Sequence, residues 1–159
     1  LGAGTILREV QAAAEMLESD YSIPADVWSV TSFNELRREG LECERWNLLH
    51  PDETPREAYV TRMLSSQPGP FVVATDYMKA LGDSIRQWVP GRYRVLGTDG
   101  YGRSDSRKAL RDFFEVDRRH VVLAALKALS EEGSVDPGTV KAAQEKLGID
   151  PDQPDPTAC

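Results

Sequence analysis

The stretch FVVATDYMKALGDSIRQWVPGRYRVLG, residues 71–97, has the pattern of a strand, a helix and a second strand. Residues 71–75 form a short, continuous apolar run, which is typical of a strand that a parallel sheet buries on both faces. Apolar residues then recur at helical spacing, at Met78, Leu81, Ile85 and Trp88. Residues 93–97 predict the next strand. Because two strands joined through a helix pair in parallel by a right-handed crossover, this stretch predicts an α/β fold.

The rest of the chain continues the alternation of helices and strands. A strand is predicted over residues 25–30, where β-branched and aromatic residues follow a proline. Gly40 costs the helix predicted over 32–49 about 1 kcal/mol and is placed to split it. Thr54, Pro55 and Glu57 form a capping signal for a helix that reaches Leu64. Further helices are predicted over residues 5–17, 105–113, 117–129 and 136–147.

This pattern predicts a three-layer α/β/α sandwich with a mostly parallel sheet. At about 100–200 residues per domain, 159 residues make one domain. We assign it to residues 1–150 and expect a loose, acidic and proline-rich tail over 151–159. The chain starts at Leu1 without a methionine, so we expect it to be a piece of a longer protein.

Composition and charge exclude several classes of function. The chain has 40% hydrophobic residues but no apolar window of roughly 18 residues, so no membrane span is predicted. Its net charge of −7 gives no general attraction for nucleic acid. Two cysteines, Cys43 and Cys159, form no disulfide framework and match no zinc spacing, which favours a reducing compartment and a cytoplasmic location.

Residues 86–120 are the one basic part of the chain. We expect a solvated or interfacial face of mixed sign here, because acidic residues are interleaved with the basic ones. The basic residues are Arg86, Arg92, Arg94, Arg103, Arg107, Lys108, Arg111, Arg118 and Arg119.

Isolated candidates for chemistry have simpler structural interpretations. Residues 2–4, Gly-Ala-Gly, resemble half of a dinucleotide fingerprint, but Leu7 stands where the third glycine belongs, so we expect a tight turn. His50 and His120 have no Cys or His at ligand spacing. Glutamates flank Cys43 and raise the expected pKa of its thiol, which favours a core or groove residue over a nucleophile. We therefore assign no catalytic, cofactor-binding or metal-binding residue.

The densest signal is GTDGYGRSDSRKALRDFFEV, residues 97–116. Three glycines within six residues follow a predicted strand, and such loops at the carboxyl end of a strand bind ligands or other domains in open α/β sheets. The pattern supports either an anion cradle or a rigid docking loop, in which charged side chains meet a partner. The candidate interface residues are Gly100, Tyr101, Gly102, Arg103, Ser104 and Asp105.

A resemblance to a known family favours the second interpretation. Residues 100–129 resemble the last part of transketolase-family C-terminal domains. More specifically, VWSVTSFNELRREG, ECERWNLLHP, TPREAYV, TDYMK and YRVLGTDGYGRSDSR resemble the homodimeric pyruvate dehydrogenases, the thiamine-dependent first components of the bacterial pyruvate dehydrogenase complex. The similarity runs from Leu1 to about Asp150 and covers only the C-terminal domain of that family.

The resemblance implies a domain that packs against preceding catalytic domains and helps to hold a homodimer. The family decarboxylates pyruvate on thiamine diphosphate with Mg²⁺ and passes the acetyl group to lipoyl domains of the dihydrolipoamide acetyltransferase component. Its diphosphate signature is Gly-Asp-Gly followed by an Asn pair, whereas this chain has Thr98-Asp99-Gly100 and asparagines only upstream, at Asn34 and Asn47. The resemblance therefore implies that the cofactor binds outside this chain. A free-standing α/β module that binds an anion or another ligand through residues 97–106 is the alternative, and a domain that is catalytic by itself ranks third.

Overall fold

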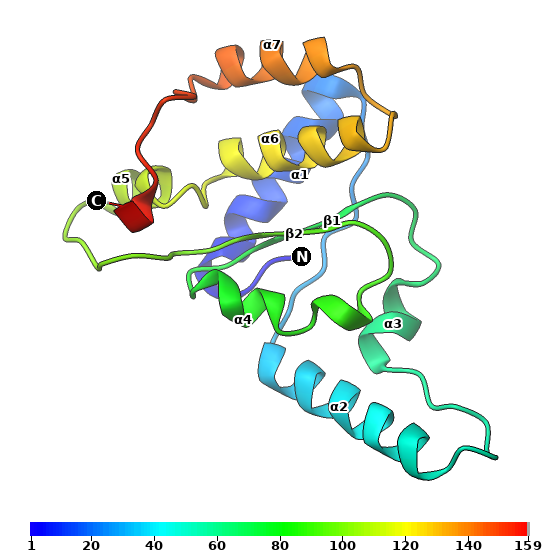
Figure 1. Ribbon diagram of the computed structural model, residues 1–159. Coiled ribbons are helices and arrows are strands. Elements are labelled where there is room, and N and C mark those ends of the chain that lie inside the picture. Colours follow the sequence, from blue (N-terminus) through cyan, green and yellow to red (C-terminus); the bar gives the residue numbers. More distant parts are fainter. Residues whose placement is uncertain (159) are drawn as a thin grey trace.

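The computed structural model describes residues 1–158, so the prediction for Cys159 lies outside the described residues. Helices dominate the chain, and two short strands lie at its centre (Figure 1). The elements are α1 (Leu7–Tyr21), α2 (Phe33–Leu49), α3 (Tyr59–Leu64), β1 (Phe71–Ala74), α4 (Lys79–Asp83), β2 (Tyr93–Leu96), α5 (Arg107–Phe113), α6 (Arg118–Glu131) and α7 (Pro137–Leu147), with single 3₁₀ turns at Gly4–Ile6, Arg86–Trp88 and Pro156–Ala158.

The two strands predicted from residues 71–97 are confirmed. β1 and β2 pair in parallel, with Phe71 opposite Tyr93 and Ala74 opposite Leu96. Gly2 adds one bridge to Ala74 and another to Ser29, so residues 1–3 lie between β1 and the segment around Ser29. The result is an α/β fold with a small parallel sheet.

The two faces of β1 are buried in separate apolar clusters. Phe71 and Val73 belong to one cluster, whereas Val72 and Ala74 contact the other. This alternation follows from the strand pleat, which points successive side chains to opposite faces. Figure 1 shows α1 and α6 on one side of the strands and α2, α3 and α4 on the other. Helices on both faces explain why the strand sequence is continuously apolar.

The predicted strand over residues 25–30 is wrong in extent. The segment is extended, but it pairs only around Ser29. Gly2 donates its N–H to the Trp28 carbonyl at 2.9 Å and accepts from the Val30 N–H at 2.9 Å. Because no other backbone of residues 1–158 pairs with this segment, its β propensity yields a single bridge.

Three predicted helices differ from the structure. Gly40 does not split α2. A glycine is required at this position because a Cβ would lie 2.5 Å from the Trp88 indole. The helix predicted from Thr54 begins only at Tyr59, because the Asn47 side-chain amide bonds both the N–H and the carbonyl of Arg56, at 2.7 and 2.9 Å. The helix predicted over residues 78–88 ends at Asp83, where the Ser84 hydroxyl donates to the Leu81 carbonyl at 2.6 Å.

Among residues 1–158, none of the helices is both long enough and apolar enough to cross a bilayer.

Candidate functional site

The glycine-rich loop, residues 97–106, leaves the carboxyl end of β2, as the sequence predicts. Its first residues pack on the loop that follows β1. The Thr98 N–H donates to the Tyr77 carbonyl at 2.9 Å, and the Thr98 hydroxyl donates to the Asp76 carbonyl at 2.7 Å. The loops after both strands therefore form one continuous surface at the carboxyl edge of the sheet.

Two carboxylates already occupy this edge. Asp76 accepts a hydrogen bond from the Thr5 hydroxyl at 3.2 Å and lies against Gly4, where α1 approaches the sheet. Asp99 accepts the Lys79 N–H at 2.9 Å, at the start of α4. An anion placed at this edge would be repelled by these two carboxylates, which already accept from the Thr5 hydroxyl and the Lys79 N–H. The anion-cradle alternative is therefore not supported.

The six candidate interface residues, Gly100 to Asp105, are all exposed, and 82% of the Tyr101 surface is accessible. The Arg103 guanidinium lies 4.2 Å from the centre of the Phe113 ring, and it forms no ion pair with residues 1–158. Ser106 ends the loop by accepting the Ala109 N–H at 3.2 Å and capping α5. The loop thus presents an exposed tyrosine and an arginine whose side chain is held by aromatic contact.

The basic segment is neutralised largely within the chain. Six of its nine basic side chains form ion pairs with acidic residues: Arg86, Arg92, Arg94, Arg111, Arg118 and Arg119. This confirms the predicted mixed-sign character of the segment. It also removes most of the positive charge that phosphate backbones would require.

Glu9 is a buried carboxylate that sequence reasoning missed. It accepts hydrogen bonds from Arg111 Nη1 at 2.8 Å, and from Arg118 through its Nε at 2.9 Å and its backbone N–H at 3.1 Å. The side-chain hydrogen bond from Arg118 holds the pKa of Glu9 below its ordinary value, although burial opposes this. A signal was present, because Glu9 shares the helix face of Ile6, Val10 and Ala13.

A second cluster joins Asp112, Asp117 and His120, whose ligand atoms lie within 4.8 Å of one another. Arg119 contacts both carboxylates, and Asp117 Oδ1 accepts the His120 N–H at 3.1 Å. Burial opposes ionisation of Asp117, but the hydrogen bonds from His120 and Arg119 outweigh it and lower its pKa to about 2. The guanidinium and the N-terminal amides of α6 use the oxygens that a cation would bind, so the donor set fits a helix cap.

The other singled-out residues have local roles. His50 stacks on Trp46, with 4.4 Å between the ring centres. Of the two cysteines, Cys43 is the nearer to His50 in the sequence. The Cys43 thiol has a raised pKa, as predicted, because of burial and the nearby Glu39 carboxylate. The predicted cause was incomplete, since Glu39 rather than the adjacent glutamates contributes most of the electrostatic effect.

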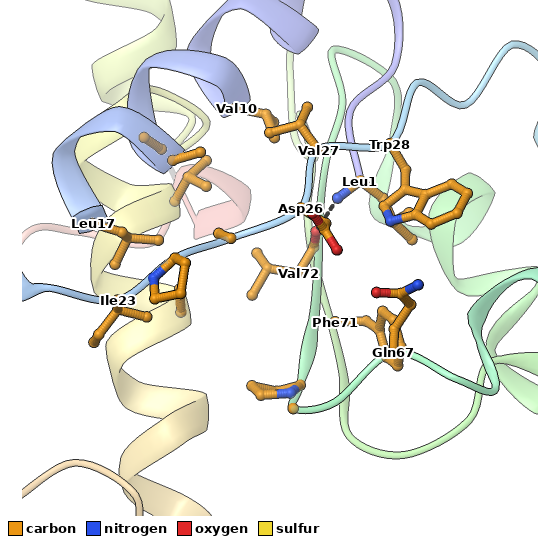
Figure 2. A pocket seen from close by; sticks show the side chains of 18 of the residues that line it. Leu1, Val10, Leu17, Ile23, Asp26, Val27, Trp28, Gln67, Phe71 and Val72 are labelled. Atoms are coloured by element: carbon orange, nitrogen blue, oxygen red, sulfur yellow. Dashed lines mark hydrogen bonds between the residues drawn. The ribbon is translucent and has the colours of Figure 1, made fainter.

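An apolar cavity of about 320 Å³ lies between α1, α6 and the first residues of β1 (Figure 2). Its polar side chains are Asp26 and Gln67. The Leu1 nitrogen donates to the Val72 carbonyl at 2.8 Å. Among residues 1–158, those that line this cavity include no nucleophile and no pair of an acid and a base.

Comparison with known proteins decides the family. Residues 1–117 match the family described as transketolase-like TK C-terminal domain. The chain belongs to this family. It is 59% identical over 160 residues to the pyruvate dehydrogenase E1 component of Pseudomonas aeruginosa, a match that covers 100% of this chain and 18% of that protein. Identity to the proteins of the same name is 54% in Cupriavidus necator and 52% in Escherichia coli K12, over 98% of the chain in both cases.

The transketolase-like C-terminal domain described here spans less than a fifth of the length of these relatives. Its two buried polar clusters are internal, since Glu9 and Asp117 both bind arginines of the same chain.

Proposed function

We propose that this chain is the C-terminal domain of a thiamine diphosphate-dependent pyruvate dehydrogenase. The parent enzyme would decarboxylate pyruvate and transfer the acetyl group to lipoyl domains. Identity of 59% along the whole chain to a pyruvate dehydrogenase E1 component is the observation that carries the proposal. The contribution of the domain itself is structural: it packs against the preceding catalytic domains and helps to hold the homodimer.

The residues of this chain do not fit thiamine diphosphate or Mg²⁺. Asp99, the aspartate of the Thr98-Asp99-Gly100 sequence that was compared with the family's diphosphate signature, accepts the Lys79 N–H. One side of Gly100 lies against the Pro156 carbonyl. The carboxylates of Asp112 and Asp117 bind Arg119. We therefore assign both cofactors to parts of the parent enzyme outside this chain.

The exposed residues Gly100 to Asp105 are the proposed docking surface. Tyrosine and arginine are enriched at the centre of protein interfaces, where a ring supplies contact area and a guanidinium can make two hydrogen bonds to one carboxylate. Tyr101 and Arg103 supply these groups, and Asp105 offers a charge of the opposite sign. Contact with Phe113 restricts the Arg103 side chain before binding, which lowers the entropy lost on docking.

The wider setting follows from the same parent enzyme. We assign the domain to residues 1–150, with a three-layer sandwich completed in the parent, and the tail to residues 151–159. The proposed partners are the preceding catalytic domains, the second subunit and the dihydrolipoamide acetyltransferase component, in the cytoplasm. Nucleic acid and membrane are not proposed as partners.

Substitution of Arg103 tests the docking role. In the full-length enzyme, Arg103→Ala should weaken dimerisation or domain packing, seen as a loss of activity on dilution that high protein concentration restores. The matched control is Arg37→Ala, which removes an exposed arginine of α2. A variant that stays dimeric at nanomolar concentration but loses affinity for a phosphorylated or carboxylate ligand would instead favour the ligand-binding module.

A further inference from the structure

The C-terminal segment returns to the glycine-rich loop. Figure 1 shows the chain after α7 running back toward α5 and the loop that follows β2. Pro156 is buried, whereas the residues on either side of it are exposed. A Cβ on Gly100 would lie 2.5 Å from the Pro156 carbonyl oxygen and 3.4 Å from the Thr157 Cα. The two segments therefore meet backbone to backbone, at a distance that only glycine permits.

We propose that residues 149–158 act as a strap that holds the loop of residues 97–106 in one conformation. The functional consequence of the strap rests on the proposed docking role of that loop, whereas the strap itself concerns only how the loop is ordered. The strap makes the C-terminal segment a positioning element.

The sequence predicts a loose tail over residues 151–159, but the strap has a defined internal structure that presents Pro156. Gly148 ends α7 in the left-handed region, at φ 66°, and Asp150 Oδ1 accepts the Asp152 N–H at 2.9 Å. Asp155 Oδ1 accepts both the N–H and the hydroxyl of Thr157, at 2.8 and 2.7 Å. These bonds, helped by the positive charge of Lys79, lower the pKa of Asp155. Asp155 thus fixes the final turn from which the Pro156 carbonyl faces Gly100.

The loop depends on the contact between Gly100 and Pro156, because its other contacts with the segment after β1 end before Gly100. Its first part is held by the segment after β1, since a Cβ on Gly97 would lie 2.7 Å from the Tyr77 carbonyl oxygen. Within residues 1–158, residues 100–104 form no hydrogen bond. Gly100 also has φ 100°, which L residues rarely adopt. The strap is therefore the last fixed point before the exposed stretch that carries Tyr101 and Arg103.

A glycine-rich loop without this contact would sample many conformations. Fixing the backbone of one residue costs about 1–2 kcal/mol, and a loop that is ordered before binding does not lose that entropy on docking. A displaced strap should therefore weaken docking without changing any residue of the docking surface.

Hydrogen–deuterium exchange of the full-length enzyme tests the strap directly. Asp155→Ala removes the acceptor of the final turn, and Gly100→Ala fills the space beside Pro156. Each should speed exchange at the Thr98 amide by about tenfold, because that N–H is bonded to the Tyr77 carbonyl and is released when the loop opens locally, whereas residues 100–104 have no hydrogen bond to lose. Asp152→Ala, in the same segment, and Gly102→Ala, with nothing within 4 Å of its Cβ position, are the matched controls.

The outcomes separate the strap from the docking role. If Asp155→Ala leaves loop exchange at the level of Asp152→Ala, the strap proposal is overturned, whatever Gly100→Ala does through its own backbone strain. Faster loop exchange in Asp155→Ala supports the strap. Sedimentation of Asp155→Ala and Asp152→Ala, both outside the docking surface, then reports on docking: unchanged dimerisation of Asp155→Ala with a mobile loop would leave the strap standing and overturn the proposed docking function.

Discussion

Asp117 shows how one side chain can stabilise a helix and an interface between helices at once. Its carboxylate caps α6 by accepting the N–H groups of Arg119 and His120, both at 3.1 Å. Arg119 also reaches the Leu147 carbonyl at 3.4 Å, at the end of α7. A negative charge at a helix N-terminus is favourable because it meets the positive end of the helix dipole. The ionised form of Asp117 is therefore preferred in the folded chain.

This preference predicts a loss of stability in acid. The pKa of Asp117 is about 2 when folded and 3.8 ordinarily, so its contribution is present above pH 3.8 and disappears as the pH falls toward 2. The difference corresponds to about 2 kcal/mol of unfolding free energy. Urea unfolding of wild type and Asp117→Asn should therefore converge by about 2 kcal/mol between pH 5 and pH 2. Asp52→Asn, at an exposed turn, should follow wild type; equal slopes for both variants would contradict the prediction.

At the scale of elements, the sequence predicted what burial dictates and missed what distant contacts dictate. The run of residues 71–75 identified β1 because a strand covered on both faces must be apolar throughout. Residues 54–58 carry a good capping signal, yet the Asn47 side chain holds Arg56 outside a helix. The exposed loop was located correctly from its glycines. The arginine partners of Glu9 were missed because they lie 102 and 109 residues away, and helical periodicity contains no information about such distant contacts.

The central position of β1 can be tested at Val73. This side chain is fully buried in the cluster beneath α2, α3 and α4. Val73→Ala should lower the unfolding free energy of the chain by about 2 kcal/mol, through lost burial and a residual cavity. Val73→Asp should cost several kcal/mol or prevent folding, because the charge has no partner. Leu48→Asp, at a position 79% exposed, is the control. A melting temperature unchanged in Val73→Ala would contradict the assignment.

At the scale of the whole molecule, charge is distributed so that little of it is left for phosphate groups. The net charge is −7, and most arginines of the basic segment bind acidic residues of the same chain. The carboxyl edge of the sheet, where many α/β proteins bind nucleotides, contains Asp76 and Asp99. Beside the charged residues of the loop, this edge exposes three large apolar or aromatic side chains, those of Tyr77, Met78 and Tyr101. Such a surface suits another protein domain better than a diphosphate.

This distribution predicts that the 159-residue chain alone does not bind thiamine diphosphate, whereas the proposed function requires that the full-length enzyme does. A diphosphate at this edge would lose its hydration beside the carboxylates of Asp76 and Asp99. Arg103, which forms no ion pair with residues 1–158, is exposed to solvent, so its charge would offset little of that cost. Titration calorimetry with thiamine diphosphate and Mg²⁺ should show no heat of binding for the chain and saturable binding for the full-length enzyme under the same conditions. Micromolar, Mg²⁺-dependent binding to the chain would place part of the cofactor site within these residues and would require a different role for the carboxyl edge.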